Sequence, residues 1–132
     1  MTPALHRGFF FAKSVAMRKL HSHNIGIDQG SLVLFSDFEE GGEMWTGKGD
    51  RRHETPVLFS EPFREPPSVL VGLSMWDMDQ KHNHRADISA RDITEAGFAI
   101  VFQTWGDTRV ARVRADWLAM GSLDDDLDWD VR

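Results

Sequence analysis

The chain contains no cysteine among its 132 residues. Without thiols it has no disulfide bonds, no zinc site built from thiolates, no iron–sulfur cluster and no cysteine nucleophile. The absence of cysteine does not indicate a cellular compartment, because secreted proteins can also lack cysteine. Covalent cross-links and thiol chemistry are therefore excluded.

Long apolar runs are also missing. Nowhere does an apolar stretch approach the roughly 18 residues that a membrane-spanning helix requires. Residues 1–16 carry His6, Arg7 and Lys13 around a short apolar stretch, which is shorter and more interrupted than the apolar core of a secretory signal. We therefore expect a soluble protein without an export signal or membrane insertion, either cytoplasmic or released.

The excess of charge is negative. Fifteen lysines and arginines stand against 21 aspartates and glutamates, which gives a formal net charge of −6 at pH 7. A negative field disfavours unspecific attraction to phosphate backbones, so nucleic acid is not expected as a partner. Much of the acidity lies after Gly121, where five aspartates stand against Arg132 alone. We interpret this segment as a solvated acidic tail.

A period of two between apolar and polar side chains runs through most of the chain, as in half-buried strands. The residues that this period assigns to the core are Val69, Val71, Leu73 and Met75; Ala86, Ile88 and Ala90; Phe98, Ile100 and Phe102; and Ala111, Val113, Ala115 and Trp117. Segments 31–35 and 55–59 are further β-prone runs. Prolines follow the second run and place it at a strand end or a sheet edge.

Five or six short strands, separated by turns rich in glycine, aspartate and proline, predict an all-β fold, an antiparallel β-sandwich. At this length we expect one domain. We divide the chain into an N-terminal extension (residues 1–29), the sandwich (residues 30–121) and the acidic tail (residues 122–132). The polar, glycine-rich stretch 37–52 is expected to be a loop, either a plain surface loop or a binding loop.

Motifs for catalysis and metal binding are weak. No Walker loop, dinucleotide fingerprint or nucleophile elbow is present, and the aspartates follow no recognised catalytic spacing. The segments His21-Ser22-His23 and His82-Asn83-His84 each place two imidazoles where a strand would put them on one face. Because a structural metal site needs about four ligands, we favour solvated turns. We expect neither an enzyme nor a metal or other cofactor.

The informative side chains are Arg85 and Trp105, which the alternation turns away from the core. An outward indole is a flat apolar platform, and a guanidinium is a fork of hydrogen-bond donors. A pyranose has a patch of C–H groups that stacks on an aromatic plane and a rim of hydroxyls, so this pair suits a small neutral carbohydrate. The alternative is that Trp105 is buried against a neighbouring copy of the chain, while Arg85 pairs with Asp87. The residue pattern by itself favours that alternative.

Five motifs occur in order along the body of the chain. They are Val57-Leu58-Phe59-Ser60-Glu61-Pro62-Phe63-Arg64-Glu65-Pro66-Pro67-Ser68-Val69-Leu70-Val71, Asn83-His84-Arg85, Ala96-Gly97-Phe98, Thr104-Trp105 and Trp117-Leu118-Ala119-Met120-Gly121. Together they resemble the H-type lectin domain of snail agglutinins and discoidins. The resemblance covers about residues 44 to 121.

This resemblance implies a six-stranded antiparallel sandwich that assembles as a homotrimer and binds galactose or N-acetylgalactosamine, without calcium, in shallow sites near subunit boundaries. The family's sugar-binding arginine matches Arg85, its stacking tryptophan matches Trp105, and a further family aspartate is nearest to Asp50. Where the snail lectin has a histidine after the tryptophan, this chain has Gly106 and then Asp107. The case for an N-acetylgalactosamine preference is weaker for this reason, and Asp107 is expected to accept hydrogen bonds from sugar hydroxyls.

The leading interpretation is therefore a trimeric lectin with glycans as partners. Leu70, Ala99 and Val101 are apolar residues on the second faces of their strands, and under this interpretation they are expected to contact a neighbouring copy of the chain. The alternative function, motivated by Gly106, is a trimeric structural or attachment module of a larger surface or phage-like assembly without active sugar binding.

Overall fold

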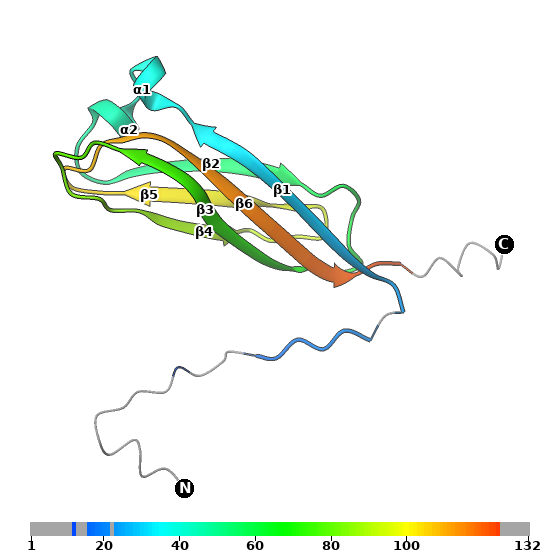
Figure 1. The fold of residues 1–132 in the computed structure, drawn as a ribbon. Coiled ribbons are helices and arrows are strands. Elements are labelled where there is room, and N and C mark those ends of the chain that lie inside the picture. The colour runs from blue at the N-terminus through cyan, green and yellow to red at the C-terminus, as the bar shows by residue number, and fades with distance from the viewer. Residues whose placement is uncertain (1–11, 13–15, 22, 125–132) are drawn as a thin grey trace, which may run out of the picture.

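Six antiparallel strands form two three-stranded sheets in the computed structural model, which describes residues 12, 16–21 and 23–124 (Figure 1). One sheet has the order β1-β6-β3 and the other the order β2-β5-β4. The elements are, in chain order, β1 (Ile25–Phe35), α1 (Asp37–Glu40), α2 (Glu43–Thr46), β2 (Arg51–Leu58), β3 (Ser68–Met78), β4 (Asp87–Arg91), β5 (Gly97–Thr104) and β6 (Val110–Ser122). The predicted antiparallel sandwich is confirmed, with two short helices added. Most of residues 1–16 and of the predicted acidic tail lie outside the described residues.

The core lies between the sheets, and β5 and β6 form its centre. Phe98, Ile100 and Phe102 of β5 are buried, and buried residues alternate with exposed ones along β6 as far as Ala119. Burying one large apolar side chain contributes roughly 1.5–3 kcal/mol relative to leaving it exposed. An edge-to-face contact between Phe98 and Trp117, with ring centroids 5.4 Å apart, joins the two layers. The predicted period of two therefore identifies the centre of this core correctly.

Strand β3 departs from the predicted alternation near its end. Its register against β6 shifts between Leu73 and Met75 and again between Asp77 and Met78. Each β-bulge adds a residue to one strand, so the side chains beyond it change face. As a result Met78 packs against the core, and the prediction that Met75 does so is wrong.

The stretch expected to be a polar loop contains two single-turn helices. Helix α1 is followed by Gly41, whose φ of 69° lies in the left-handed region. The carboxylate of Asp37 accepts a hydrogen bond of 2.9 Å from the N–H of Met44, and Met44 is buried in the core. Four residues are too few to show a helical stripe, so the sequence pattern did not reveal these turns.

Strand β1 begins at Ile25, earlier than the segment 31–35 suggests. Ile27 pairs with Met120, and the pairing with β6 continues along nearly the whole strand. The glycine and the polar residues between Ile27 and Leu32 resemble a turn when read locally. The long β6 partner is what holds them extended.

The side chains on the outer face of β5 are buried by neighbouring residues of the same chain. Val101 is 1% exposed and Ala99 is also buried. β5 is the central strand of its sheet, and Val101 has Glu54 and Ser89 as its cross-strand neighbours. The prediction that Ala99 and Val101 contact another copy of the chain is wrong, because the chain itself already buries them. Leu70, by contrast, is 73% exposed.

Candidate functional site

The predicted site residues gather at one end of the sandwich, where β5 ends and β2 and β4 begin (Figure 1). Near the end of β5, Gln103 is paired on both sides, with β2 and with β4. Continuing this register by two residues places Trp105 in line with Asp50 on one side and with Arg85 on the other. Sheet pairing thus gathers three residues that are far apart in the sequence.

Trp105 is 42% exposed and borders an open pocket of about 420 Å³. The pocket is lined by Asp50, Arg51, Arg52, Gln103, Thr104 and Trp105. An aromatic face beside a few polar groups is typical of a site for a small polar ligand. Arg85 stands outside this lining, on the β4 side of Trp105.

Arg85 forms an ion pair with Asp107. Its Nη1 donates a hydrogen bond of 2.6 Å to the Oδ1 of Asp107, and Asn83 donates to the same oxygen at 3.4 Å. The hydrogen bond from Arg85 is the main cause that lowers the pKa of Asp107 below its ordinary value, and Asn83 lowers it further. Asp107 is therefore a carboxylate, and so a hydrogen-bond acceptor, at neutral pH. The hypothesis that Arg85 pairs with Asp87 is wrong, since the turn after Trp105 supplies its partner.

Gly106 makes room for the guanidinium of Arg85. Its φ of 69° is left-handed, and a Cβ at this position would lie 2.9 Å from the Nη1 of Arg85. A side chain here would therefore be strained and would also displace Arg85. The absence of a side chain at this position thus has a structural reason in this chain.

Two buried threonine hydroxyls hold the segment before β4 against the end of β5 and the turn that follows it. Thr104 donates to the carbonyl of Arg85, and Thr108 donates to the carbonyl of Asn83, both at 2.6 Å. Buried hydrogen bonds of this kind each contribute about 1 kcal/mol and fix the geometry. Neither positioning residue was predicted from the sequence; the Thr-Trp motif was the one signal that pointed to the first of them.

Arg51 clamps the loop that carries Asp50. It is 6% exposed, and its guanidinium donates to the carbonyls of Gly49, Met44 and Gly106 at 3.0, 3.1 and 3.2 Å. These carbonyls belong to the loop before β2, to α2 and to the turn after Trp105. One buried cation therefore holds both walls of the pocket in place. The sequence pattern placed Arg51 in a polar loop and gave no sign of its burial.

The second histidine pair is used within the chain. Nδ1 of His82 lies 2.9 Å from Oδ2 of Asp79, and Nε2 of His84 lies 3.3 Å from the carbonyl oxygen of Asp79. The N–H of Lys81 is the main cause that lowers the pKa of Asp79, and His82 and Arg109 lower it further. Among the described residues, no group of three or more histidines, aspartates or glutamates could hold a metal ion. This pair therefore orders the turn between β3 and β4.

In the part of the chain that the structure describes, no helix is both long and apolar enough to span a lipid bilayer.

The end of the sandwich combines three chemical capacities. Trp105 offers a half-exposed aromatic face, Asp50 and Asp107 offer carboxylate acceptors on either side of it, and Arg85 offers guanidinium donors. A ligand with one apolar face and several hydroxyl groups matches all three capacities.

Comparison with known proteins gives a family match and several relatives. A model of the H-type lectin domain matches residues 54–120. A protein from Fuscovulum blasticum, described as open reading frame 7 of the ATP synthase subunits region, is 62% identical over 108 residues, which cover 82% of this chain and 94% of the relative. A discoidin-1 polypeptide from Dictyostelium discoideum is 36% identical over 75 residues, which cover 56% of this chain and 30% of the discoidin.

The solved structure of discoidin II from Dictyostelium discoideum shares the fold. It aligns with a TM-score of 0.66 at 23% sequence identity, over 78% of this chain and 39% of the discoidin chain. The chain thus spans less than half of the length of the discoidins that it matches, and nearly all of the Fuscovulum relative.

Proposed function

The chain belongs to the H-type lectin domain family, and we propose that it is a non-enzymatic carbohydrate-binding protein that recognises sugars of the galactose and N-acetylgalactosamine type. The observation that carries the proposal is the half-exposed Trp105, which has Asp50 beside it in one pocket and the Arg85–Asp107 pair beyond it. In galactose-type sugars one ring face exposes mainly C–H groups, and that face stacks on the indole.

The polar side chains bind the hydroxyl rim of the sugar. The carboxylates of Asp50 and Asp107 accept hydrogen bonds from hydroxyls, and Arg85 donates to hydroxyl oxygens. Asp107 engages Nη1 of Arg85, and a guanidinium has five N–H donors, so this ion pair still has donors for a ligand. The ion pair also fixes the direction of the guanidinium before the ligand arrives, which reduces the entropy lost on binding.

Gly106 reduces the selectivity between the two sugars. In the snail lectin a histidine after the tryptophan contacts the acetamido group, and this chain has no side chain there. One such hydrogen bond is worth about 1 kcal/mol, which is roughly a fivefold change in affinity. We expect galactose and N-acetylgalactosamine to bind within about tenfold of each other.

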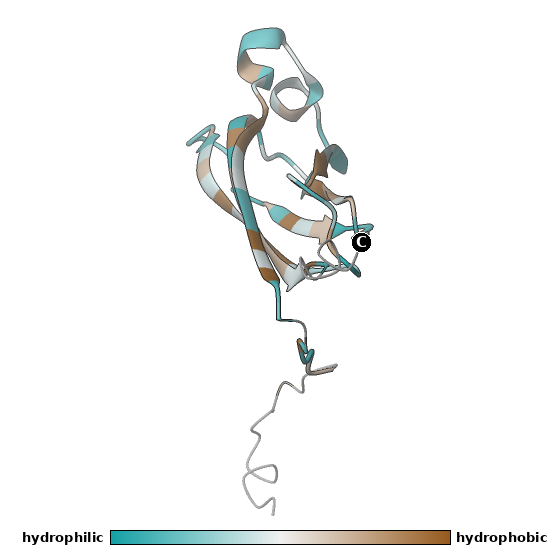
Figure 2. Cartoon of the chain, turned by 90° about the vertical axis from the view of Figure 1, so that its right-hand side faces the viewer, coloured by the Kyte–Doolittle hydropathy of each residue, from teal (hydrophilic) through white to brown (hydrophobic). Residues whose placement is uncertain are grey.

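We propose further that the chain forms a homotrimer through the outer face of the sheet β1-β6-β3. Exposed apolar side chains from all three strands lie on that face, near one end Ile25, Ile27, Leu70, Leu118 and Met120, and further along it Val33. Figure 2 shows brown, hydrophobic bands along the first part of β1. A cluster of exposed apolar side chains on a folded chain is typical of a subunit interface. Several weak sites on one assembly raise the avidity by about a hundredfold or more when the receptor spacing matches.

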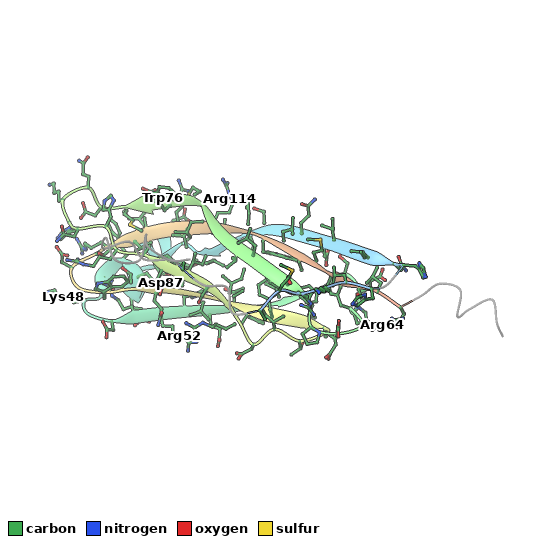
Figure 3. The ribbon with its side chains drawn as sticks, turned by 90° about the horizontal axis from the view of Figure 1, so that it is seen from below. Lys48, Arg52, Arg64, Trp76, Asp87 and Arg114 are labelled. Atoms are coloured by element: carbon green, nitrogen blue, oxygen red, sulfur yellow. The ribbon has the colours of Figure 1, made fainter. Side chains whose placement is uncertain are left out.

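Titration calorimetry with galactose and with N-acetylgalactosamine tests the proposal. We expect a dissociation constant on the order of 1 mM for a single shallow site. Trp105→Ala removes the platform and Arg85→Ala removes the donors, so each is expected to raise this constant at least about tenfold. Arg64→Ala is the matched control, because Arg64 is exposed and lies at the opposite end of the sandwich (Figure 3). Folded wild-type protein that binds neither these sugars nor any glycan on an array would refute the lectin and would favour a structural or attachment module.

A further inference from the structure

A second groove opens at the edge of the sandwich, between β3 and the segment that leads into β4. It has a volume of about 310 Å³ and is lined by Leu73, Trp76, Met78, His84 and Ala86. β3 and β4 are edge strands of different sheets, so the groove lies where the two layers meet at one side. Figure 3 draws Trp76 in the layer of β3 and Asp87, the first residue of β4, in the other layer.

The indole of Trp76 is partly uncovered at the side of the sandwich. Trp76 is 59% exposed, yet it pairs with the buried Val113 of β6, and paired residues of antiparallel strands share a face. Its side chain therefore starts on the inner face of β3. The residues that line the groove from the other layer, His84 and Ala86, precede β4, which begins at Asp87. The end of the sandwich thus leaves a large aromatic surface open to a ligand.

His84 supplies a polar group beside this indole. Its Nε2 lies 3.3 Å from the carbonyl oxygen of Asp79, and a carbonyl oxygen can only accept a hydrogen bond. Nε2 therefore carries the proton in this contact, and Nδ1 of the neutral imidazole is an acceptor. The groove combines an aromatic platform, an acceptor and an apolar floor, as the Trp105 pocket combines an indole with the carboxylate of Asp50.

The groove shares one wall with the Trp105 site. Along the segment 83–86, the even-numbered residues line the groove, while Asn83 and Arg85 donate hydrogen bonds to Asp107. Successive side chains of an extended segment point to opposite sides. One stretch of backbone therefore separates the two surfaces, and both are open at the same end of the molecule.

We propose that this Trp76 groove is a second saccharide subsite, an inference that rests on the carbohydrate binding proposed above. One sugar ring stacks its C–H face on Trp76, and one of its hydroxyls donates to Nδ1 of His84. The ligand class is a galactose-containing oligosaccharide, and a ring of the glycan outside the Trp105 pocket occupies the groove.

Indole N–H resonances test the subsite directly. In ¹H–¹⁵N spectra, the resonances of Trp76 and Trp105 are assigned from Trp76→Phe and Trp105→Phe, and the full chain is titrated with galactose and with the galactose-terminated tetrasaccharide lacto-N-neotetraose. We expect the Trp105 resonance to shift with both sugars and the Trp76 resonance to shift with the tetrasaccharide. Equal midpoints for the two resonances mean that one glycan spans both sites, and different midpoints mean that two glycans bind; either result supports a saccharide subsite.

Variants give the second readout. We expect Trp76→Ala to weaken tetrasaccharide binding about tenfold and galactose binding less than twofold, and Trp76→Phe to retain most of the affinity because it keeps an aromatic face. Phe38→Ala is the matched control, since Phe38 of α1 is an aromatic residue of similar exposure outside the groove.

Three outcomes would overturn the proposal of a second saccharide subsite. If the Trp105 resonance shifts and the Trp76 resonance does not, the subsite fails and the lectin stands. If neither resonance responds to either sugar, both proposals fail. If Trp76→Ala changes the oligomeric mass and leaves tetrasaccharide binding unchanged, the groove is a contact between copies of the chain and not a sugar site.

Discussion

Arg85 and Trp105 are positioned at the site by different structural features, and these features differ in how well the sequence predicts them. Trp105 follows the last residue of β5, so the alternation along that strand predicts that it leaves the core. The alternation also turns Arg85 away from the core, but the position of its guanidinium depends on the turn that contains Gly106 and Asp107, in another part of the chain. The sequence therefore predicted which residue types lie at the site, but it did not predict that Asp107 pairs with the guanidinium of Arg85.

Gly106→Ala tests whether the absence of a side chain at this turn positions Arg85. We expect a loss of about 1–2 kcal/mol in the free energy of unfolding from the left-handed φ, and about tenfold weaker galactose binding because the new Cβ displaces Arg85. Urea unfolding and titration calorimetry measure the two effects.

Gly41→Ala is the matched control for this prediction. Gly41 has the same φ of 69°, and a Cβ there would have no neighbour within 4 Å. We expect a similar loss of stability and unchanged sugar binding. Equal affinities in the two variants would contradict the role assigned to Gly106.

The elements around the site are held by hydrogen bonds to carbonyl groups rather than by long helices or strands. α2 is a single turn, and the loop before β2 and the turn after β5 have little regular structure. The guanidinium of Arg51 joins all three through their carbonyl oxygens. A fork of five N–H groups suits this task, and a lysine ammonium does not.

We expect Arg51→Met to lower the free energy of unfolding by about 2–4 kcal/mol, because three carbonyls each lose a donor. Arg51→Lys is expected to recover less than half of that loss. The neighbouring Arg52 is exposed and pairs with Glu54 at 3.5 Å, so Arg52→Met is expected to change the stability by less than about 0.5 kcal/mol. Urea unfolding of the three variants checks this, and comparable effects at both positions would show that Arg51 is not a clamp.

For the whole molecule, the two sheets differ in their outer faces. The outer face of the sheet β2-β5-β4 carries charged residues such as Arg52 and Glu54 and covers Val101, whereas the outer face of the sheet β1-β6-β3 leaves apolar residues exposed. The second face gains more by association, because burying it removes the larger apolar area from water. This asymmetry is why the trimer proposal uses Leu70 and not the residues of β5.

Leu70→Asp is expected to separate the trimer into single chains, because it places a carboxylate in the apolar face opposite Leu118. Light scattering measures the mass, and binding to a galactose-coated surface is expected to fall about a hundredfold with the lost avidity. Leu58→Asp is the control, since Leu58 is 82% exposed at the end of β2 in the other sheet. A wild-type protein that already has the mass of one chain would contradict the trimer.

The sequence by itself determined the fold class, most of the core and the outward direction of Trp105. These features follow from the period of two along each strand, which is a local property of an extended backbone. Only the tertiary structure decided which side chains of β3 face the core beyond its β-bulges. It also decided the burial of Arg51, Ala99 and Val101 and the partner of Arg85. Each of these depends on where a neighbouring strand begins, ends or shifts its register, and no local pattern contains that information.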